Sequence, residues 1–177
     1  MAGPTDLTKN ALLVGLFSIT PAQVYLGAPP GETATGLELT PAGVQRVGSD
    51  VDTSLWSWRD VSAVRVVGAP VKSGFGRGLA AVGVAASIVL TWWSVSAPDP
   101  MTVAVETADS CGELPVDSAA AIAYTPREAE LSQLLLNRFA DGSLSPSLMT
   151  EWRRNEPEPR RLSARAREGL LLRWVQS

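Results

Sequence analysis

The chain has 177 residues, of which 45% are apolar and 19% are charged, a balance typical of a globular protein rather than a disordered one. It has no histidine and a single cysteine, Cys111. The sequence therefore excludes Ser-His-Asp and Cys-His catalysis, zinc sites built from histidine or from several cysteines, and an internal disulfide. The net charge of −3 argues against a nucleic-acid partner. No residue pattern predicts a metal or a cofactor.

The charges are unevenly distributed along the chain. Residues 1–150 contain 8 basic and 14 acidic residues, whereas residues 151–177 contain 7 arginines and 4 glutamates. This change predicts a domain of residues 1–142, followed by an Arg-rich helical extension over residues 143–177.

An apolar run, ALLVGLFSI, occupies residues 11–19 near the start of the chain. It could be the apolar core of a signal peptide, but Asp6 accompanies Lys9 upstream of it and the cleavage signal is poor. The preferred interpretation is a buried strand or an extended arm that ends at Pro21.

Residues 35–67 alternate between apolar and polar side chains in several short stretches. The stretches 37–40 and 44–47 flank a turn at residues 41–43, which predicts a hairpin with a three-residue loop. Two more alternating stretches follow at residues 54–58 and 61–67. Consecutive strands of this kind predict an antiparallel meander.

The second half of the chain begins with two further strands. Residues 101–106 alternate as a strand, and residues 113–116 form a weaker one. Because proline cannot donate a backbone hydrogen bond, Pro115 predicts that this last strand lies at an edge of the sheet.

The clearest helix signal starts at Thr125, with Pro126 at the first helical position and Glu128 completing a capping box. We expect this helix to end at Gly142 and to present one apolar stripe, made of Leu131, Leu134, Leu135 and Phe139. A short helix is predicted from Ser145-Pro146, and a last helix from about Ser163 to Val175. In the last helix Leu170, Leu171, Trp174 and Val175 share one side, and Arg165, Arg167 and Arg173 point toward solvent.

Two stretches resemble bacterial pleckstrin-homology-like (PH-like) and GRAM-like domains. Leu37–Val47 is similar to the opening L-x-L-T-x-x-G-V turn of such domains, and Trp58–Val66 is similar to their W-x-D-[VI]-x-x-[VI]-x-V strand entry. The resemblance implies an α+β fold in which an antiparallel PH-like sheet or barrel is capped by helix 126–140. It also implies that Trp58 is a buried anchor. Six strands are counted where the family has seven, and run 11–26 could supply another.

Few residues are candidates for catalysis or ligand binding. The acidic pairs Asp50/Asp52, Glu128/Glu130 and Glu156/Glu158 fall in a turn, the start of a helix and a proline linker, where acidic residues are common for structural reasons. Phosphoinositide headgroups require basic residues in the first hairpin loop, and Pro41-Ala42-Gly43 offers none. We therefore expect no headgroup binding.

Residues 78–98 carry no charge and admit two interpretations. As a helix, the segment has marginal length for a bilayer core of about 30 Å. A transmembrane span would also separate strands 37–67 from strands 101–116. We therefore prefer an apolar helical insert that packs on a protein surface. With two further tryptophans, its large side chains form the predicted interaction surface: Leu79, Val82, Val84, Ile88, Trp92, Trp93, Trp152 and Trp174.

The sequence thus predicts a non-catalytic binding or scaffolding module in the cytoplasm, which contacts a protein partner or a second copy of itself. The main alternative is an inner-membrane protein anchored by residues 78–98. A less favoured alternative is an enzyme that uses acidic residues.

Overall fold

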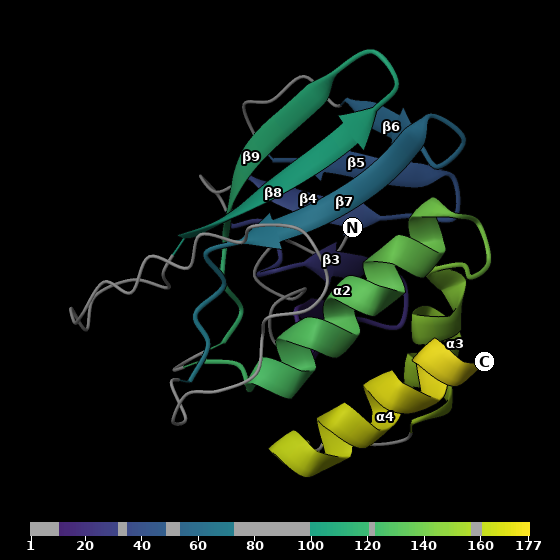
Figure 1. Cartoon of the computed structure of the whole chain (residues 1–177). Coiled ribbons are helices and arrows are strands. Elements are labelled where there is room, and N and C mark those ends of the chain that lie inside the picture. Colours follow the sequence, from purple (N-terminus) through teal and green to yellow (C-terminus); the bar gives the residue numbers. More distant parts are fainter. Residues whose placement is uncertain (1–10, 32–34, 49–53, 73–99, 121–122, 157–160) are drawn as a thin grey trace.

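The computed structural model describes residues 11–31, 35–48, 54–72, 100–120, 123–156 and 161–177. In these residues the protein is α+β, with nine strands in two antiparallel sheets and three helices (Figure 1). The larger sheet contains β1 to β6 in chain order, and the smaller contains β7, β8 and β9. The described strands form these two separate sheets and no closed barrel.

The apolar run near the start of the chain forms a hairpin, so the expectation of one strand or arm over residues 11–19 is wrong. Strands β1 (Leu12–Val14) and β2 (Phe17–Ile19) pair with each other, and β3 (Val24–Leu26) pairs with β2. Gly15 makes the turn at a φ of 57°, a conformation that favours glycine. A Cβ at Gly15 would also collide with the hydroxyl of Ser132, so the turn requires glycine for two reasons.

The predicted hairpin that follows is confirmed. Strands β4 (Gly36–Leu39) and β5 (Gly43–Val47) pair, with Leu39 opposite Val44, and β6 (Leu55–Ser57) adds to β5. A Cβ at Gly43 would overlap the backbone carbonyl of Trp56, so glycine allows β6 to approach closely.

The smaller sheet contains the three remaining predicted strands, but the predicted meander through residue 67 is wrong, because residues 61–67 leave the larger sheet and pair with residues 100–107. The smaller sheet consists of β7 (Val61–Val67), β8 (Pro100–Thr107) and β9 (Cys111–Asp117), and β9 with Pro115 lies at its edge. The opposite edge, at β7, is covered by Gln133. Its side-chain amide donates to the carbonyl of Val64 (2.7 Å) and accepts from the N–H of Val66 (3.2 Å). These bonds satisfy backbone groups at an edge that a further strand would otherwise pair with.

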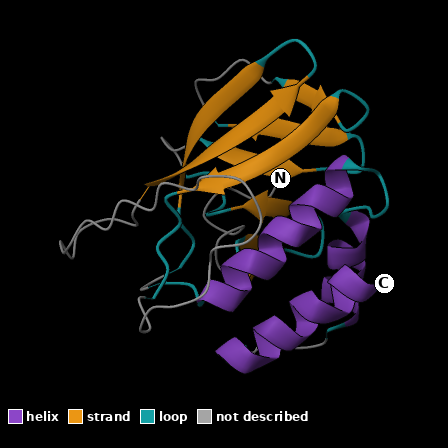
Figure 2. Ribbon diagram, viewed as in Figure 1, coloured by secondary structure: helices purple, strands orange, loops and turns teal. Residues whose placement is uncertain are grey.

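The three helices follow the sheets: α2 (Pro126–Ala140), α3 (Ser147–Asn155) and α4 (Ala164–Gln176). Figure 2 shows α2 and α4 side by side, with α3 near the C-terminal ends of both. The predicted capping box is confirmed, because Thr125 accepts from the N–H of Glu128 and the Glu128 carboxylate accepts from the N–H of Thr125.

The buried face of α2 is rotated from the predicted stripe. Leu131, Leu135 and Phe139 are buried as expected, but Leu134 is 42% exposed and Leu136 is fully buried. The physical reason is that α2 packs both along β7 and against α4, so the buried arc extends toward Leu136 rather than toward Leu134. The placement of Leu134 in the core is therefore wrong.

The helices after residue 142 contribute to the same core as the sheets. Met149, Leu170, Leu171 and Trp174 belong to the hydrophobic cluster that also contains the buried side chains of both sheets. Arg167 does not point to solvent as expected. It bonds instead to the buried carboxylate of Glu128 on α2.

Candidate functional site

A cleft opens at the C-terminal end of α2, with a volume of about 560 Å³. Its walls come from the β4–β5 turn, the segment between β6 and β7, the end of α2, the loop to α3, the start of α3 and Ser177. The lining residues are Pro41, Trp58, Phe139, Gly142, Ser143, Leu144, Ser145, Pro146, Ser147, Leu148, Glu151 and Ser177. Segments distant in sequence thus meet around one hollow.

Trp58 forms the aromatic wall of this cleft. Its indole Nε1–H donates to the carbonyl of Thr40 (2.8 Å), and its ring lies 6.1 Å from that of Phe139 at an angle of 54°. The prediction that Trp58 anchors the sheet agrees with these contacts, but the expected full burial is wrong. The side chain is half-buried, and it lines the cleft.

Three of the four serine hydroxyls that line the cleft have an acceptor within the protein, and the fourth, that of Ser147, accepts from Ser145. The Ser145 hydroxyl donates to the Ser147 hydroxyl (3.1 Å), and the Ser177 hydroxyl donates to the carbonyl of Trp174 (2.9 Å). The Ser143 hydroxyl lies 3.3 Å from the carbonyl oxygen of Arg138. Hydrogen bonds from the Ser143 side chain and backbone also hold the pKa of Asp141 below its ordinary value.

Most backbone N–H groups along the cleft are also engaged. In the loop after α2, the N–H of Gly142 donates to the carbonyl of Phe139 (3.2 Å), that of Ser143 to Asp141 Oδ1 (2.8 Å), and that of Leu144 to the carbonyl of Arg138 (3.0 Å).

The same is true at the start of α3. The N–H groups of Ser147 and Leu148 donate to the side chain and the carbonyl of Ser145, and the N–H of Met149 donates to the carbonyl of Pro146. The oxygen atoms that line the cleft therefore offer more hydrogen-bond acceptors to a ligand than the remaining N–H and O–H groups offer donors.

One titratable side chain, that of the exposed Glu151, occurs among the described residues that line the cleft. No lysine or arginine belongs to that lining. The cleft can thus accept hydrogen bonds and attract positive charge, but its lining does not supply an acid and a base for catalysis.

The opposite end of α2 is closed by a network of polar groups. The carboxylate of Glu128 is fully buried, accepts from the N–H of Thr125 (2.8 Å), and forms an ion pair with Arg167 of α4. The Thr125 hydroxyl donates to Glu168 Oε1 (2.5 Å), and Arg167 also donates to the carbonyl of Leu162 (2.8 Å). This network joins α4 to α2, and every named group in it has a partner.

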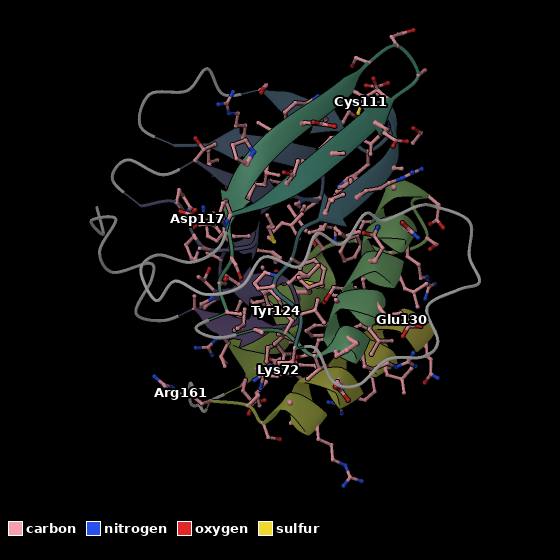
Figure 3. The ribbon with its side chains drawn as sticks, turned by 60° about the vertical axis from the view of Figure 1, so that its left-hand side comes forward. Lys72, Cys111, Asp117, Tyr124, Glu130 and Arg161 are labelled. Carbon is pink, nitrogen blue, oxygen red and sulfur yellow. The ribbon has the colours of Figure 1, made fainter. Side chains whose placement is uncertain are left out.

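The acidic pairs noted in the sequence do not form a site in the described residues. Glu128 points into the protein, whereas Glu130 pairs with Arg127 at the surface (2.8 Å; Figure 3). Asp50, Asp52 and Glu158 lie outside the described residues. The part of the chain that the structure describes contains no group of three or more potential metal-binding side chains. Cys111 is exposed at the β8–β9 turn, far from Lys72 and Tyr124 (Figure 3).

Most of the predicted interaction surface lies outside the described residues: Leu79, Val82, Val84, Ile88, Trp92 and Trp93. Trp152 and Trp174 pack against each other edge to face, with ring centres 5.5 Å apart. Trp174 is only 7% exposed and belongs to the core, while Trp152 is half-buried. Among the described residues, no helix combines the length and apolar character needed to cross a membrane.

The sequence predicts Trp58 as an anchor, Gly142 as a helix end and Ser145-Pro146 as a helix start, but it does not predict that these residues line a common cleft. The local signal is a run of small, polar and proline residues between two amphipathic helices. No protein-family model, curated protein or solved structure matches the chain.

Proposed function

We propose that this protein is a non-catalytic binding module of PH-like fold that holds a segment of a protein partner in the cleft beside Trp58. The partner is another protein or a second copy of this chain, and the module acts in the cytoplasm. We expect neither nucleic acid nor a phosphoinositide headgroup in this cleft, since no lysine or arginine belongs to its described lining.

The PH-like part of the proposal is supported by the order of the elements. An antiparallel meander in chain order is followed by a second, smaller sheet and then by α2, which packs against β7. The L-x-L-T-x-x-G-V turn corresponds to β4 and β5, and the W-x-D strand entry leads into β7. The departure is the strand number, because the described residues contain nine strands rather than seven.

The observation that carries the binding function is the composition of the cleft. Trp58, Phe139, Leu144 and Leu148 provide apolar surface in a hollow of about 560 Å³, within the size range of ligand sites. Polar oxygens lie around the same hollow. Apolar walls with a few fixed polar atoms suit recognition, and the lining lacks the paired titratable groups that catalysis uses.

A peptide selection tests this function. A random peptide library displayed on phage is selected on the immobilised full-length chain, and the enriched peptides are then measured against two matched variants. Leu148→Lys places a long charged side chain in the cleft, whereas Leu172→Lys changes an exposed leucine on α4 that does not line it. We expect a shared motif whose binding is lost in Leu148→Lys and retained in Leu172→Lys.

Failure of the selection to enrich a motif, or equal binding by both variants, would contradict the proposal. Sedimentation velocity of the same proteins tests the second-copy partner. Concentration-dependent association that Leu148→Lys abolishes and Leu172→Lys preserves identifies the cleft as the self-association site.

The membrane-anchored alternative rests on residues 78–98, which lie outside the described residues. Val84→Arg distinguishes it, because an arginine at a bilayer centre opposes insertion by about 2.5–3.5 kcal/mol. Fractionation of parent and variant gives the result. A parent recovered only in detergent-extracted membranes, with a variant released from them, would favour the anchor over the cytoplasmic module.

A further inference from the structure

We propose that the cleft beside Trp58 binds an arginine side chain of the partner protein, which combines a cationic guanidinium group with an apolar methylene stem. This inference rests on the proposed function. The identity of the ligand group follows from three features of the site: the balance of donors and acceptors, the charge, and the aromatic wall.

The balance of hydrogen-bonding groups favours a donor-rich ligand. The indole N–H of Trp58 and the hydroxyls of Ser145 and Ser177 each donate to an acceptor inside the protein. The Ser143 hydroxyl has the carbonyl of Arg138 within reach. Apart from the hydroxyl proton of Ser147, what remains for a ligand is mainly oxygen lone pairs. A guanidinium group carries five N–H donors and no acceptor, so it complements this lining, whereas a carboxylate or phosphate does not.

The charge that lines the cleft favours the same ligand. Glu151 supplies a negative charge, and no lysine or arginine belongs to the described lining. The end of α2 and the start of α3 carry opposite partial charges, and the backbone groups of both helix ends are engaged, so the two ends do not decide the sign.

Arg138 is the positive charge closest in sequence to the loop. Its Nε donates to the Ser143 hydroxyl (3.0 Å) and its Nη1 donates to the carbonyl of Val175 (2.5 Å). These two bonds keep the guanidinium occupied, and Asp141 lies nearby in the chain as a counter-charge.

The aromatic wall distinguishes arginine from a simple ammonium ion. The hydrogen bond to Thr40 and the contact with Phe139 fix the orientation of the Trp58 ring. A planar guanidinium stacks on an indole face more readily than a compact, strongly hydrated ammonium does. Leu144 and Leu148 offer apolar surface for the methylene stem of the side chain.

The test uses the full-length chain with ¹⁵N-labelled indoles, and follows the Trp58 Nε1–H resonance by NMR. Trp58→Phe assigns that resonance. The probes are four acetylated, amidated tripeptides that differ only at the central position: Leu-Arg-Leu, Leu-citrulline-Leu, Leu-Glu-Leu and Leu-Leu-Leu. Citrulline keeps the shape of arginine and removes its charge.

We expect the arginine peptide to shift the Trp58 resonance saturably and to bind about tenfold more tightly than the citrulline peptide. Glu151→Gln should weaken the arginine peptide by a similar factor and leave the citrulline peptide unchanged. Glu130→Gln is the matched control, since Glu130 pairs with Arg127 on the surface of α2, and it should change neither affinity.

The outcomes separate the ligand class from the binding function. If the leucine or glutamate peptide binds as tightly as the arginine peptide, or if Glu151→Gln has no effect, the cleft binds ligands but not through a cation, and the inference is overturned alone. If no peptide shifts the Trp58 resonance and phage selection also yields none, the binding function fails with it.

Discussion

The two ends of α2 differ in how their polar groups are satisfied. At the N-terminal end, the buried carboxylate of Glu128 is bonded to Arg167 and to the N–H of Thr125. At the C-terminal end, oxygens and the exposed carboxylate of Glu151 surround a cleft. The N-terminal end of α2, the closed end, therefore uses its charges to join α4 to α2. The C-terminal end, the open end, keeps hydrogen-bond acceptors that face the cleft. An acidic residue on a helix is a candidate for function only where its partners are not already supplied by the fold.

The largest effect is expected from breaking the closed end. Glu128→Ala should lower the free energy of unfolding by about 3–5 kcal/mol, because it removes a fully buried carboxylate that pairs with the partly buried Arg167 and accepts from the N–H of Thr125. Chemical denaturation measures this change. Glu130→Ala removes an exposed carboxylate from the same helix and should cost at most about 0.5 kcal/mol. Equal stability of the two variants would show that the buried pair does not join the helices.

The middle of α2 offers a second matched pair. Leu135 is fully buried and Leu134 is 42% exposed, so Leu135→Ala should cost about 2–5 kcal/mol. Leu134→Ala should cost about 0.5 kcal/mol or less, as surface substitutions do. Thermal melts of both variants test the rotated face. Similar losses of stability for the two variants would mean that Leu134 is also a core residue, as the sequence predicts.

A third carboxylate, Glu38 on β4, gives an effect of opposite sign. Burial raises the pKa of Glu38 above its ordinary value of 4.5, while a hydrogen bond from Gln23 partly offsets this. It lies opposite Tyr25, whose pKa is raised to about 12, first by burial and then by Glu38.

Because the folded-state pKa of Glu38 exceeds its unfolded value, ionisation of this group costs stability, and the cost disappears as the pH falls through the raised pKa. Glu38→Gln should therefore stabilise the protein slightly at pH 7, by at most about 0.5 kcal/mol. Urea titrations should show this advantage shrinking as the pH falls from 7 toward 4.5, and absent below that pH. An advantage that grows toward low pH would contradict the assigned direction of the shift.

The smallest effect on stability is expected at the open end. Glu151 is exposed, so Glu151→Gln should change the free energy of unfolding by no more than about 0.5 kcal/mol. Denaturation curves of Glu151→Gln and Glu128→Gln compare the two ends with the same substitution. A large loss in Glu151→Gln would mean that this carboxylate also has a structural role, and the contrast between the ends would disappear.

Local signals in the sequence were sufficient for some elements. The capping box at Thr125 and Glu128, the β4–β5 hairpin and the edge position of Pro115 each depend on neighbouring residues, and each prediction is confirmed. The hairpin at Gly15 was missed because both of its strands are apolar, so the run lacks the alternation that marks separate strands.

The remaining differences depend on contacts between distant residues. Leu134 is exposed and Arg167 is paired because α4 packs against α2, and helical periodicity alone does not reveal which neighbour a helix will have. The cleft brings Trp58, which lies between β6 and β7, together with Phe139 on α2 and Glu151 on α3. No local motif encodes such a site. The aromatic at a strand entry was visible in the sequence, but its exposure on one side was not.

The most direct test of the account is a reversal of charge at the open end of α2. Glu151→Arg replaces the acceptor with a donor-rich cation while leaving Trp58 and the apolar wall in place. The affinities of the arginine and glutamate tripeptides are then measured on parent and variant by the Trp58 indole resonance. The account predicts that the parent prefers the arginine peptide and that Glu151→Arg prefers the glutamate peptide. A variant that still prefers the arginine peptide would contradict it.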